Sequence, residues 1–252
     1  MKVRGKSESR IKSESLWDKP FDARTYVKYA VVNFILMLVL FYVVLNTILY
    51  DWTGSLYPVG SGFRLLLDGL DDAIPFVPNM VIFYEYLFYG MAILTMLYFA
   101  FVEFRKGYAL GWSLVVINAI AIVIYIIFPV STYQWRLMYE GQLNLSNFWQ
   151  AEVYRIFTTD TPFNCFPSLH AAVSTICFYS WYRYSQVRLT VVTKVVAIVA
   201  LVVAAGVILS TLFIKQHYIV DEIAGILLAW GVGRPLFNHF WKPAKIKGSM
   251  TR

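Results

Sequence analysis

The chain has 252 residues, of which 59% are hydrophobic and 15% are charged. Soluble domains have roughly 25% charged residues, and several uncharged runs here reach the roughly 20 residues that a membrane-crossing helix needs, so a soluble globular protein is excluded. The net charge of +7 does not indicate nucleic-acid binding, because the basic residues mostly flank the apolar runs, as membrane topology requires.

Six apolar segments are predicted to cross the membrane, so the expected fold is an all-α membrane protein with a six-transmembrane-helix bundle. A basic segment over residues 1–28 precedes this membrane domain at 29–241, and a basic tail follows at 242–252. No cleavable signal is expected, since the first apolar run is too long for one. The predicted segments are Tyr29–Tyr50, Met80–Val102, Tyr108–Phe128, Pro167–Tyr182, Val195–Ile214 and one from near His217 to about Trp230 or a few residues beyond.

The distribution of Lys and Arg predicts the orientation of the bundle. Eight basic residues lie before the first segment, two between the second and third, three between the fourth and fifth and five after the sixth, against four elsewhere. Basic residues accumulate on the cytoplasmic side, so both termini of this multi-pass protein are expected in the cytoplasm, with the plasma membrane as its location. The loops 51–79 and 129–166 then lie outside.

Two short polar islands interrupt the apolar sequence, and both fall on the predicted outer side. In the island from Ser210 to Asp221, His217 and Asp221 are four residues apart and would share one face of a helix that begins there. The carboxylate can hold the imidazole in one tautomer and stabilise its charged form, so His217 is a candidate nucleophile or base. The alternative is a polar helix cap at the membrane interface.

The other island contains the tetrapeptide Pro167–His170 at the start of an apolar run. Proline suits the first helical position, and the free N–H groups of a helix start favour a phosphate oxyanion, to which the Ser168 hydroxyl adds a donor. His170, one turn into the helix, would protonate a leaving oxygen. A loop serine and a capping histidine would explain the same pattern.

The two islands together point to one chemistry. Phosphoryl transfer needs a nucleophile, an acid for the leaving group and cations around the equatorial oxygens. His217 and His170 supply the first two, and Arg136 or Lys215 supplies the third, all on one predicted side. The sequence therefore predicts an active site on the outer face.

These motifs resemble those of the phosphatidic acid phosphatase type 2 superfamily of membrane enzymes. The family's third motif is Ser-Arg, five residues, His, three residues and Asp, and Ser210, His217 and Asp221 keep that spacing. The tetrapeptide Pro167–His170 is similar to the family's Pro-Ser-Gly-His. The family's first motif, Lys, six residues and Arg-Pro, is not intact here. Its nearest match, residues 128–136, is similar to the form of this motif in a divergent branch that includes inositol phosphorylceramide synthase-like transferases.

The resemblance covers roughly residues 68–235 and implies a role for each matching residue. His217 would attack phosphorus and form a phosphohistidine, Asp221 would orient it, and His170 would be the general acid; no cofactor and no metal is implied. Thr211 replaces the family's Arg, and Leu169 replaces its Gly, so both departures concern the phosphate cradle. The phosphate-binding residues are then expected to be Arg136, Ser168, Lys215 and Ser210.

Cys165 and Cys177 are interpreted as lying on one helix, about 18 Å apart at 1.5 Å per residue, which is too far for a disulfide. Several other polar residues are expected to have structural roles. They are His239 at the cytoplasmic end, Tyr218 and Glu222 at the membrane interface, and Asp71 and Asp72 in a loop or a helix cap.

The predicted function is that of a metal-independent phosphatase that hydrolyses a lipid phosphate monoester or diphosphate at the outer leaflet through a phosphohistidine. A lipid is favoured because the site lies at interface depth, so the expected partners are the substrate and membrane lipids, with no nucleic acid. Two alternatives remain: a phosphotransferase that moves a phospho-head-group between lipids or onto a lipid or sugar hydroxyl, and a non-enzymatic lipid transporter. A transporter would show a broken apolar segment in both halves, and no matched pair is present.

Overall fold

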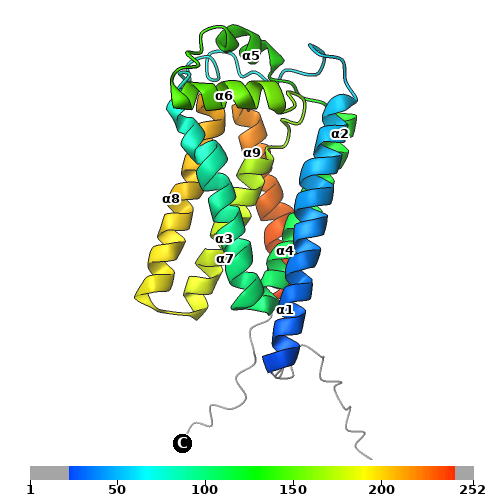
Figure 1. The fold of residues 1–252 in the computed structure, drawn as a ribbon, viewed down its shortest axis with the longest axis vertical. Helices are drawn as coiled ribbons and strands as arrows, with labels where there is room; N and C mark the ends of the chain where they lie inside the picture. Colours follow the sequence, from blue (N-terminus) through cyan, green and yellow to red (C-terminus); the bar gives the residue numbers. More distant parts are fainter. Residues whose placement is uncertain (1–22, 242–252) are drawn as a thin grey trace, which may run out of the picture.

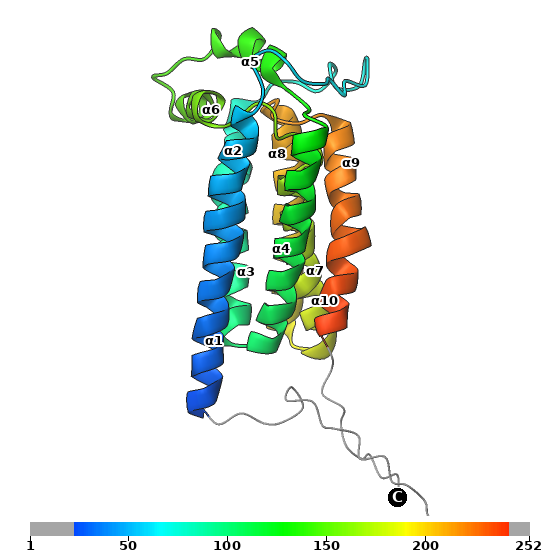
Figure 2. The ribbon, with the colours of Figure 1, turned by 90° about the vertical axis from the view of Figure 1, so that its right-hand side faces the viewer.

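The computed structural model describes residues 23–241, so the predicted tail 242–252 and most of the basic segment 1–28 lie outside the described residues. Long helices run side by side along the longest axis, and two short ones lie across one end of the bundle, at the top of Figures 1 and 2. In chain order the elements are α1 (Ala23–Met37), η2 (Leu38–Leu49), α2 (Tyr50–Ser55), η3 (Pro78–Met80), η4 (Ile82–Leu87), α3 (Phe88–Phe101), α4 (Phe104–Ile127), α5 (Tyr133–Glu140), α6 (Phe148–Thr159), α7 (Leu169–Val187), α8 (Val191–Phe213), α9 (Ile219–Leu228), η5 (Ala229–Gly233) and α10 (Arg234–Phe240).

Four of the six predicted membrane segments are confirmed as helices long and apolar enough to cross a bilayer. The other two coincide with α7 and with the continuous run from α9 to α10, so they are helical, while their crossing of the membrane and the orientation of the bundle stay predictions. The last run extends to Phe240, further than the predicted end, and Pro235 lies within it, directly after the π-helical segment η5. The four helices are Val27–Ser55, Pro78–Phe101, Arg105–Ile127 and Val191–Phe213.

Helix α4 lies at the centre of the bundle. Its residues Leu110, Leu114, Ile117 and Ala121 are fully buried, and their spacing of four, three and four places them on one face. This face belongs to a single large apolar cluster that also takes in residues of α3, α7, α8 and α10. Helix α4 thereby packs against both α3 and α7, which also contact each other and flank the site described below.

The second predicted outer loop, residues 129–166, is largely helical, because it contains α5 and α6. Both helices are amphipathic: α5 buries Trp135 and Arg136, and α6 buries Val153, Ile156 and Phe157, while their other faces are more open. Such short amphipathic stretches lack the long apolar run by which a spanning helix is found. They close one end of the bundle, where α7 begins and where α8 turns into α9.

Both cysteines are free and buried. The interpretation that they share one helix is wrong, since α7 begins only at Leu169, with Ser168 as its N-cap, and Cys165 lies in the segment before it. The position of Cys165 matters for the site, because its backbone carbonyl reaches the loop between α8 and α9.

Candidate active site

The loop between α8 and α9 carries His217. This loop is short and buried: Ile214, Lys215, Gln216 and His217 are all at most 5% exposed. Lys215 adopts a left-handed backbone conformation, with φ at +60°, which turns the chain sharply between the two helices. The turn places the imidazole of His217 inside the bundle and against the segment that precedes α7.

His217 is held by hydrogen bonding through one ring nitrogen. Its Nδ1 lies 2.9 Å from the Cys165 carbonyl oxygen and 3.5 Å from Oδ2 of Asp221. A carbonyl can only accept, so Nδ1 carries the proton and Nε2 keeps its lone pair. His217 lies in the loop before α9, so it does not share a helix face with Asp221 as predicted. The side chains of His217 and Asp221 are nevertheless in contact.

The pKa of His217 reflects opposing influences. Burial alone would lower it, but the contact with Asp221, the nearby charges of Glu222 and Asp221 and the Cys165 carbonyl outweigh burial and raise the pKa above its ordinary value. These surroundings therefore stabilise a positive charge on the ring, while the ring that can act as a nucleophile is the neutral form with its proton on Nδ1. A histidine that gains a bond to phosphorus acquires the same positive charge, so the surroundings also suit that state.

His170 lies in the first turn of α7, which Ser168 caps by accepting a hydrogen bond from the Ala171 N–H. The His170 ring stacks on Tyr84, with centroids 4.2 Å apart, and contacts Phe88 at 4.4 Å. Its centroid lies 5.9 Å from that of His217. The two histidines, 47 positions apart in the sequence, are neighbours in the structure.

The distance between the histidines depends on close contact between α7 and α9. The Ser168 N–H donates to the Asp221 carbonyl at 3.0 Å, which joins the starts of the two helices. Gly225, one turn further along α9, packs directly against α7: a Cβ atom at this position would lie 2.3 Å from the Ser168 carbonyl oxygen and 2.9 Å from Cβ of Ala171. Only glycine permits this approach.

Replacing Gly225 with alanine is therefore expected to push α7 and α9 apart, lowering the free energy of unfolding by about 1–3 kcal/mol through overpacking and reducing any activity that needs both histidines. The measurement is the thermal unfolding midpoint in detergent together with the initial rate. Gly231→Ala is the matched control, because no atom lies within 4 Å of its added Cβ. Equal behaviour of the two variants would contradict the close-packing argument.

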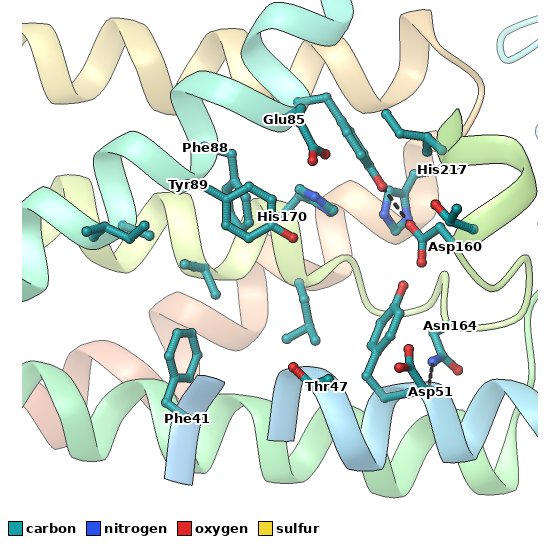
Figure 3. A pocket seen from close by; sticks show the side chains of 18 of the residues that line it. Phe41, Thr47, Asp51, Glu85, Phe88, Tyr89, Asp160, Asn164, His170 and His217 are labelled. Carbon is teal, nitrogen blue, oxygen red and sulfur yellow. Dashed lines mark hydrogen bonds between the residues drawn. The ribbon is translucent and has the colours of Figure 1, made fainter. Parts of the chain in front are cut away.

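A cavity of about 250 Å³ opens beside the two histidines. It lies between the continuous helix formed by η2 and α2 on one side and α3, α6 and α7 on the other. Figure 3 shows His170, His217 and Asp160 around it, with Asp51 and Thr47 on the facing helix. Phe41, Ala92 and Met96 line the part furthest from this polar end. The cavity thus has one polar end that contains both histidines and one apolar end.

Several residues at the polar end escape prediction from the sequence. The Tyr84 hydroxyl donates to Oδ2 of Asp160 at 3.1 Å, so an acid from the end of α6 fixes the ring on which His170 stacks. Arg155 is the basic residue among those that line the cavity, and it pairs with Glu85 at 2.9 Å and with Glu152 at 3.0 Å. No local pattern marks Asp160 or Arg155, because each stands alone in a polar stretch of sequence.

Arg136 is buried among backbone carbonyls and does not line the cavity. Its guanidinium donates to the carbonyls of Phe157 at 3.1 Å, Asp160 at 2.6 Å and Thr161 at 3.1 Å, and to Oε1 of Gln216 at 2.7 Å. These carbonyls are at the C-terminal end of α6, where a cation is favoured by the helix dipole. Arg136 therefore joins the end of α6 to the loop that carries His217.

Lys215 has a comparable arrangement. Its Nζ donates to the carbonyls of Asp71 at 2.9 Å and Ile74 at 2.6 Å, and lies 4.8 Å from the ring centroid of Trp135. Burial lowers its pKa, against the opposing charges of Asp71 and Asp72. Asp71 itself accepts from the Ile219 N–H at 2.9 Å, so it joins its own loop to the first residue of α9 and has a structural role.

The two remaining predicted phosphate ligands, Ser168 and Ser210, are fully buried and do not line the cavity. The Ser210 hydroxyl donates to the Val207 carbonyl of its own helix at 2.7 Å. Thr211, where the family pattern has an Arg, lies 2.9 Å from Oε1 of Glu222. No cation occupies this position within the described residues.

Glu222 and Tyr218 are inside the protein and not at the membrane interface, with exposed fractions of 3% and 1%. The interfacial interpretation is wrong because both side chains are covered by protein: the Tyr218 hydroxyl donates to the Ser131 carbonyl at 2.9 Å, and Glu222 accepts from Thr211. The Tyr218 contact has no local signal, since it joins segments 87 residues apart in the sequence.

Cys165, His217 and Asp221 are the group within residues 23–241 that could hold a metal ion, with ligand atoms within 4.8 Å of one another. Their hydrogen bonds favour other roles. Nδ1 of His217 donates to a carbonyl, Oδ2 of Asp221 accepts from the Tyr218 N–H at 2.8 Å, and burial raises the pKa of the Cys165 thiol. A protonated thiol and a protonated ring nitrogen are poor metal ligands, so a site without metal stays the prediction.

The family model described as PAP2 superfamily matches residues 59–233, more than half of the chain. No curated protein and no solved structure matched the chain. The matched region contains both histidine motifs and most of the cavity that they line. Membership supports a phosphatase or phosphotransferase function on lipid phosphates in general. With its paired histidines and its apolar helices, the chain belongs to the PAP2 superfamily, the phosphatidic acid phosphatase type 2 family that its motifs resemble.

Proposed function

We propose that the protein is a membrane phosphatase that hydrolyses a lipid phosphate through a phosphohistidine on His217. The observation that carries the proposal is the cavity that His170 and His217 line together, with Nδ1 of His217 engaged by a carbonyl and Nε2 left as the nucleophilic nitrogen. Its apolar end supports a lipid as the substrate, because it offers the substrate a hydrophobic environment next to the catalytic pair.

In the first step Nε2 of His217 attacks phosphorus and the bond to the leaving oxygen breaks. The proton on His170 passes to that oxygen, so the alcohol leaves neutral. The imidazole then carries phosphate and a positive charge, which Asp221 and the Cys165 carbonyl stabilise through Nδ1–H.

In the second step neutral His170 accepts a proton from water, and the hydroxide attacks the phosphohistidine. Phosphate leaves, Nε2 regains its lone pair and His170 is again protonated, so the cycle closes without an added cofactor. Arg155 is placed to meet the phosphate oxygens, since it lines the cavity. Arg136 and Lys215 have a supporting role in the proposal, holding the loops that carry His217 and Asp160.

Transfer to a lipid or sugar hydroxyl uses the same residues, with the hydroxyl in place of water. The apolar end of the cavity favours this as a second candidate, because it can also receive a lipid acceptor. The proposal further includes six membrane crossings, cytoplasmic termini and a site that faces the outside of the plasma membrane. The support is the excess of basic residues in the end segments and in the loops opposite the histidines.

The test uses purified full-length protein in detergent with a panel of lipid phosphates and phospholipid head-group donors, with and without acceptor alcohols, in the presence of a chelator. Phosphate release is the expected result, and a phosphorylated acceptor would identify the transferase. An acid-labile, base-stable protein phosphate trapped by rapid quenching would support the intermediate. Wild-type protein that neither releases nor transfers phosphate across the panel contradicts the proposal.

The acidic side of the pH–rate profile is expected to follow His217, which attacks only when Nε2 is unprotonated. The rate therefore falls as the pH drops through its pKa, which Asp221 and Glu222 hold above the usual value against the effect of burial. The Asp221→Asn variant lacks the carboxylate that raises the pKa of His217. The midpoint of the acidic limb of its pH–rate profile is therefore expected at lower pH, and its maximal rate is expected to be lower. Initial rates across pH for both proteins check this, and an unmoved or higher midpoint is the contrary result.

A further inference from the structure

The cavity extends well beyond the two histidines, along helix α3. Glu85 lines its polar end and Met96 its apolar end, and eleven residues at the rise of a helix correspond to about 16 Å. Phe88 and Ala92 line it between these points. The cavity is therefore an elongated slot that runs from the catalytic pair into the apolar part of the bundle.

The inner wall of the slot is well buried and apolar. Phe41, Ala92 and Met96 have exposed fractions of 5%, 4% and 9%, and Val173 from α7 is 1% exposed. Such a wall offers no polar partner to a ligand, so its occupant must be hydrocarbon. The head of the same occupant would reach His170, which lines the slot at its polar end.

The outer wall of the slot is thin. Tyr89 and Ile93 of α3 line the slot, yet they are 41% and 47% exposed on the outside of the bundle. Thr47 on the facing helix is also both exposed and part of the lining. Figure 3 shows Phe41, Thr47 and Asp51 on one side of the slot and Glu85, Phe88 and Tyr89 on the other. A hydrocarbon chain can thus enter sideways, between η2 and α3.

We propose that this slot takes a single acyl chain of the substrate and that Ala92 and Met96 set the chain length that the enzyme prefers. The volume of about 250 Å³ is below the roughly 300–1,000 Å³ of sites that enclose whole drug-sized ligands, so a second chain stays in the bilayer. Ala92 is the small residue midway along the slot, and Met96 closes its far end. This inference rests on the proposed phosphatase function.

The test measures kcat/KM for a homologous series of single-chain alkyl phosphates, from short to long, in detergent micelles. Ala92→Phe fills the slot midway, and each methylene that is excluded is expected to lower kcat/KM about fourfold. In this variant, kcat/KM for long-chain substrates should therefore fall at least about tenfold relative to kcat/KM for the shortest substrate, which reaches only the polar end. Met96→Ala lengthens the slot, so it should shift the preference toward longer chains.

Leu94→Phe is the matched control, since this residue lies on the same helix, is 67% exposed and does not line the slot. It should keep the wild-type chain-length profile. If wild-type protein acts on no member of the series and on no other lipid phosphate, the proposed function itself fails. If wild-type protein is active but Ala92→Phe and Met96→Ala both keep its profile, the slot inference is overturned while the function stands. Retained activity on the shortest substrate shows that Ala92→Phe is folded.

Discussion

Replacing His217 with alanine is expected to lower phosphate release by about a thousandfold or more, because the variant has no nitrogen to form the covalent intermediate. Trapping experiments should find no phosphorylated protein in this variant. The fold should persist, since Asp221 keeps the Tyr218 N–H as a donor, and truncation of His217, which lines the cavity, opens the space next to the Cys165 carbonyl to water from the cavity. The measurement is steady-state phosphate release from the best lipid phosphate of the panel.

His239→Ala is the matched control for this experiment. His239 lies on α10, is exposed and contacts Phe240, and it does not line the cavity. The control should therefore release phosphate at the wild-type rate. Substantial phosphate release by His217→Ala, with the labelled intermediate still present, would rule out His217 as the nucleophile and direct attention to His170.

Replacing Arg136 with methionine is expected to reduce the free energy of unfolding by at least about 3 kcal/mol. Three backbone carbonyls and Oε1 of Gln216 lose their donor in a buried region, and each buried acceptor left unpaired costs about 1–3 kcal/mol. Arg136→Lys should restore only part of the loss, since one ammonium cannot reproduce the fork of a guanidinium. The thermal unfolding midpoint, followed by tryptophan fluorescence in detergent, checks the prediction.

Arg24→Met, at the exposed start of α1, is the control and should leave the unfolding midpoint unchanged. The experiment also separates two roles for Arg136. A variant that keeps its unfolding midpoint but binds substrate poorly would support direct phosphate binding, as the sequence predicts. A variant that unfolds early would support the role that the carbonyl contacts indicate, which is to hold α6 against the histidine loop.

The parts of the fold that the sequence predicts well are those with a local signal. A span such as Arg105–Ile127 is recognisable from its unbroken hydrophobicity, and the spacing of Ser210, His217 and Asp221 is contained in a few turns of chain. The amphipathic helices α5 and α6 escape this reasoning because they are short and half polar. Their presence changes the site, since α6 contributes Asp160 and Arg155 to the cavity region.

The cations show why the rest could not be predicted. Arg136 and Lys215 lie in polar stretches on the predicted outer side, next to the histidine motifs. This position is as compatible with phosphate binding as with a structural role. Their partners decide the matter, and these lie far away in sequence: Lys215 bonds to Asp71 and Ile74, and Arg136 to the end of α6. No spacing rule within one segment records such pairs.

The contacts that the loop between α8 and α9 makes with earlier segments have a consequence for biosynthesis. The surroundings of His217 draw on the Asp71 region, on Cys165 and on α9, so they are complete only when α9 has been synthesised and has packed against the earlier segments. A nascent chain that has inserted only the helices up to α7 contains His170 but not His217. Under the proposed function, such a chain cannot act on lipid phosphates until α9 has joined the bundle.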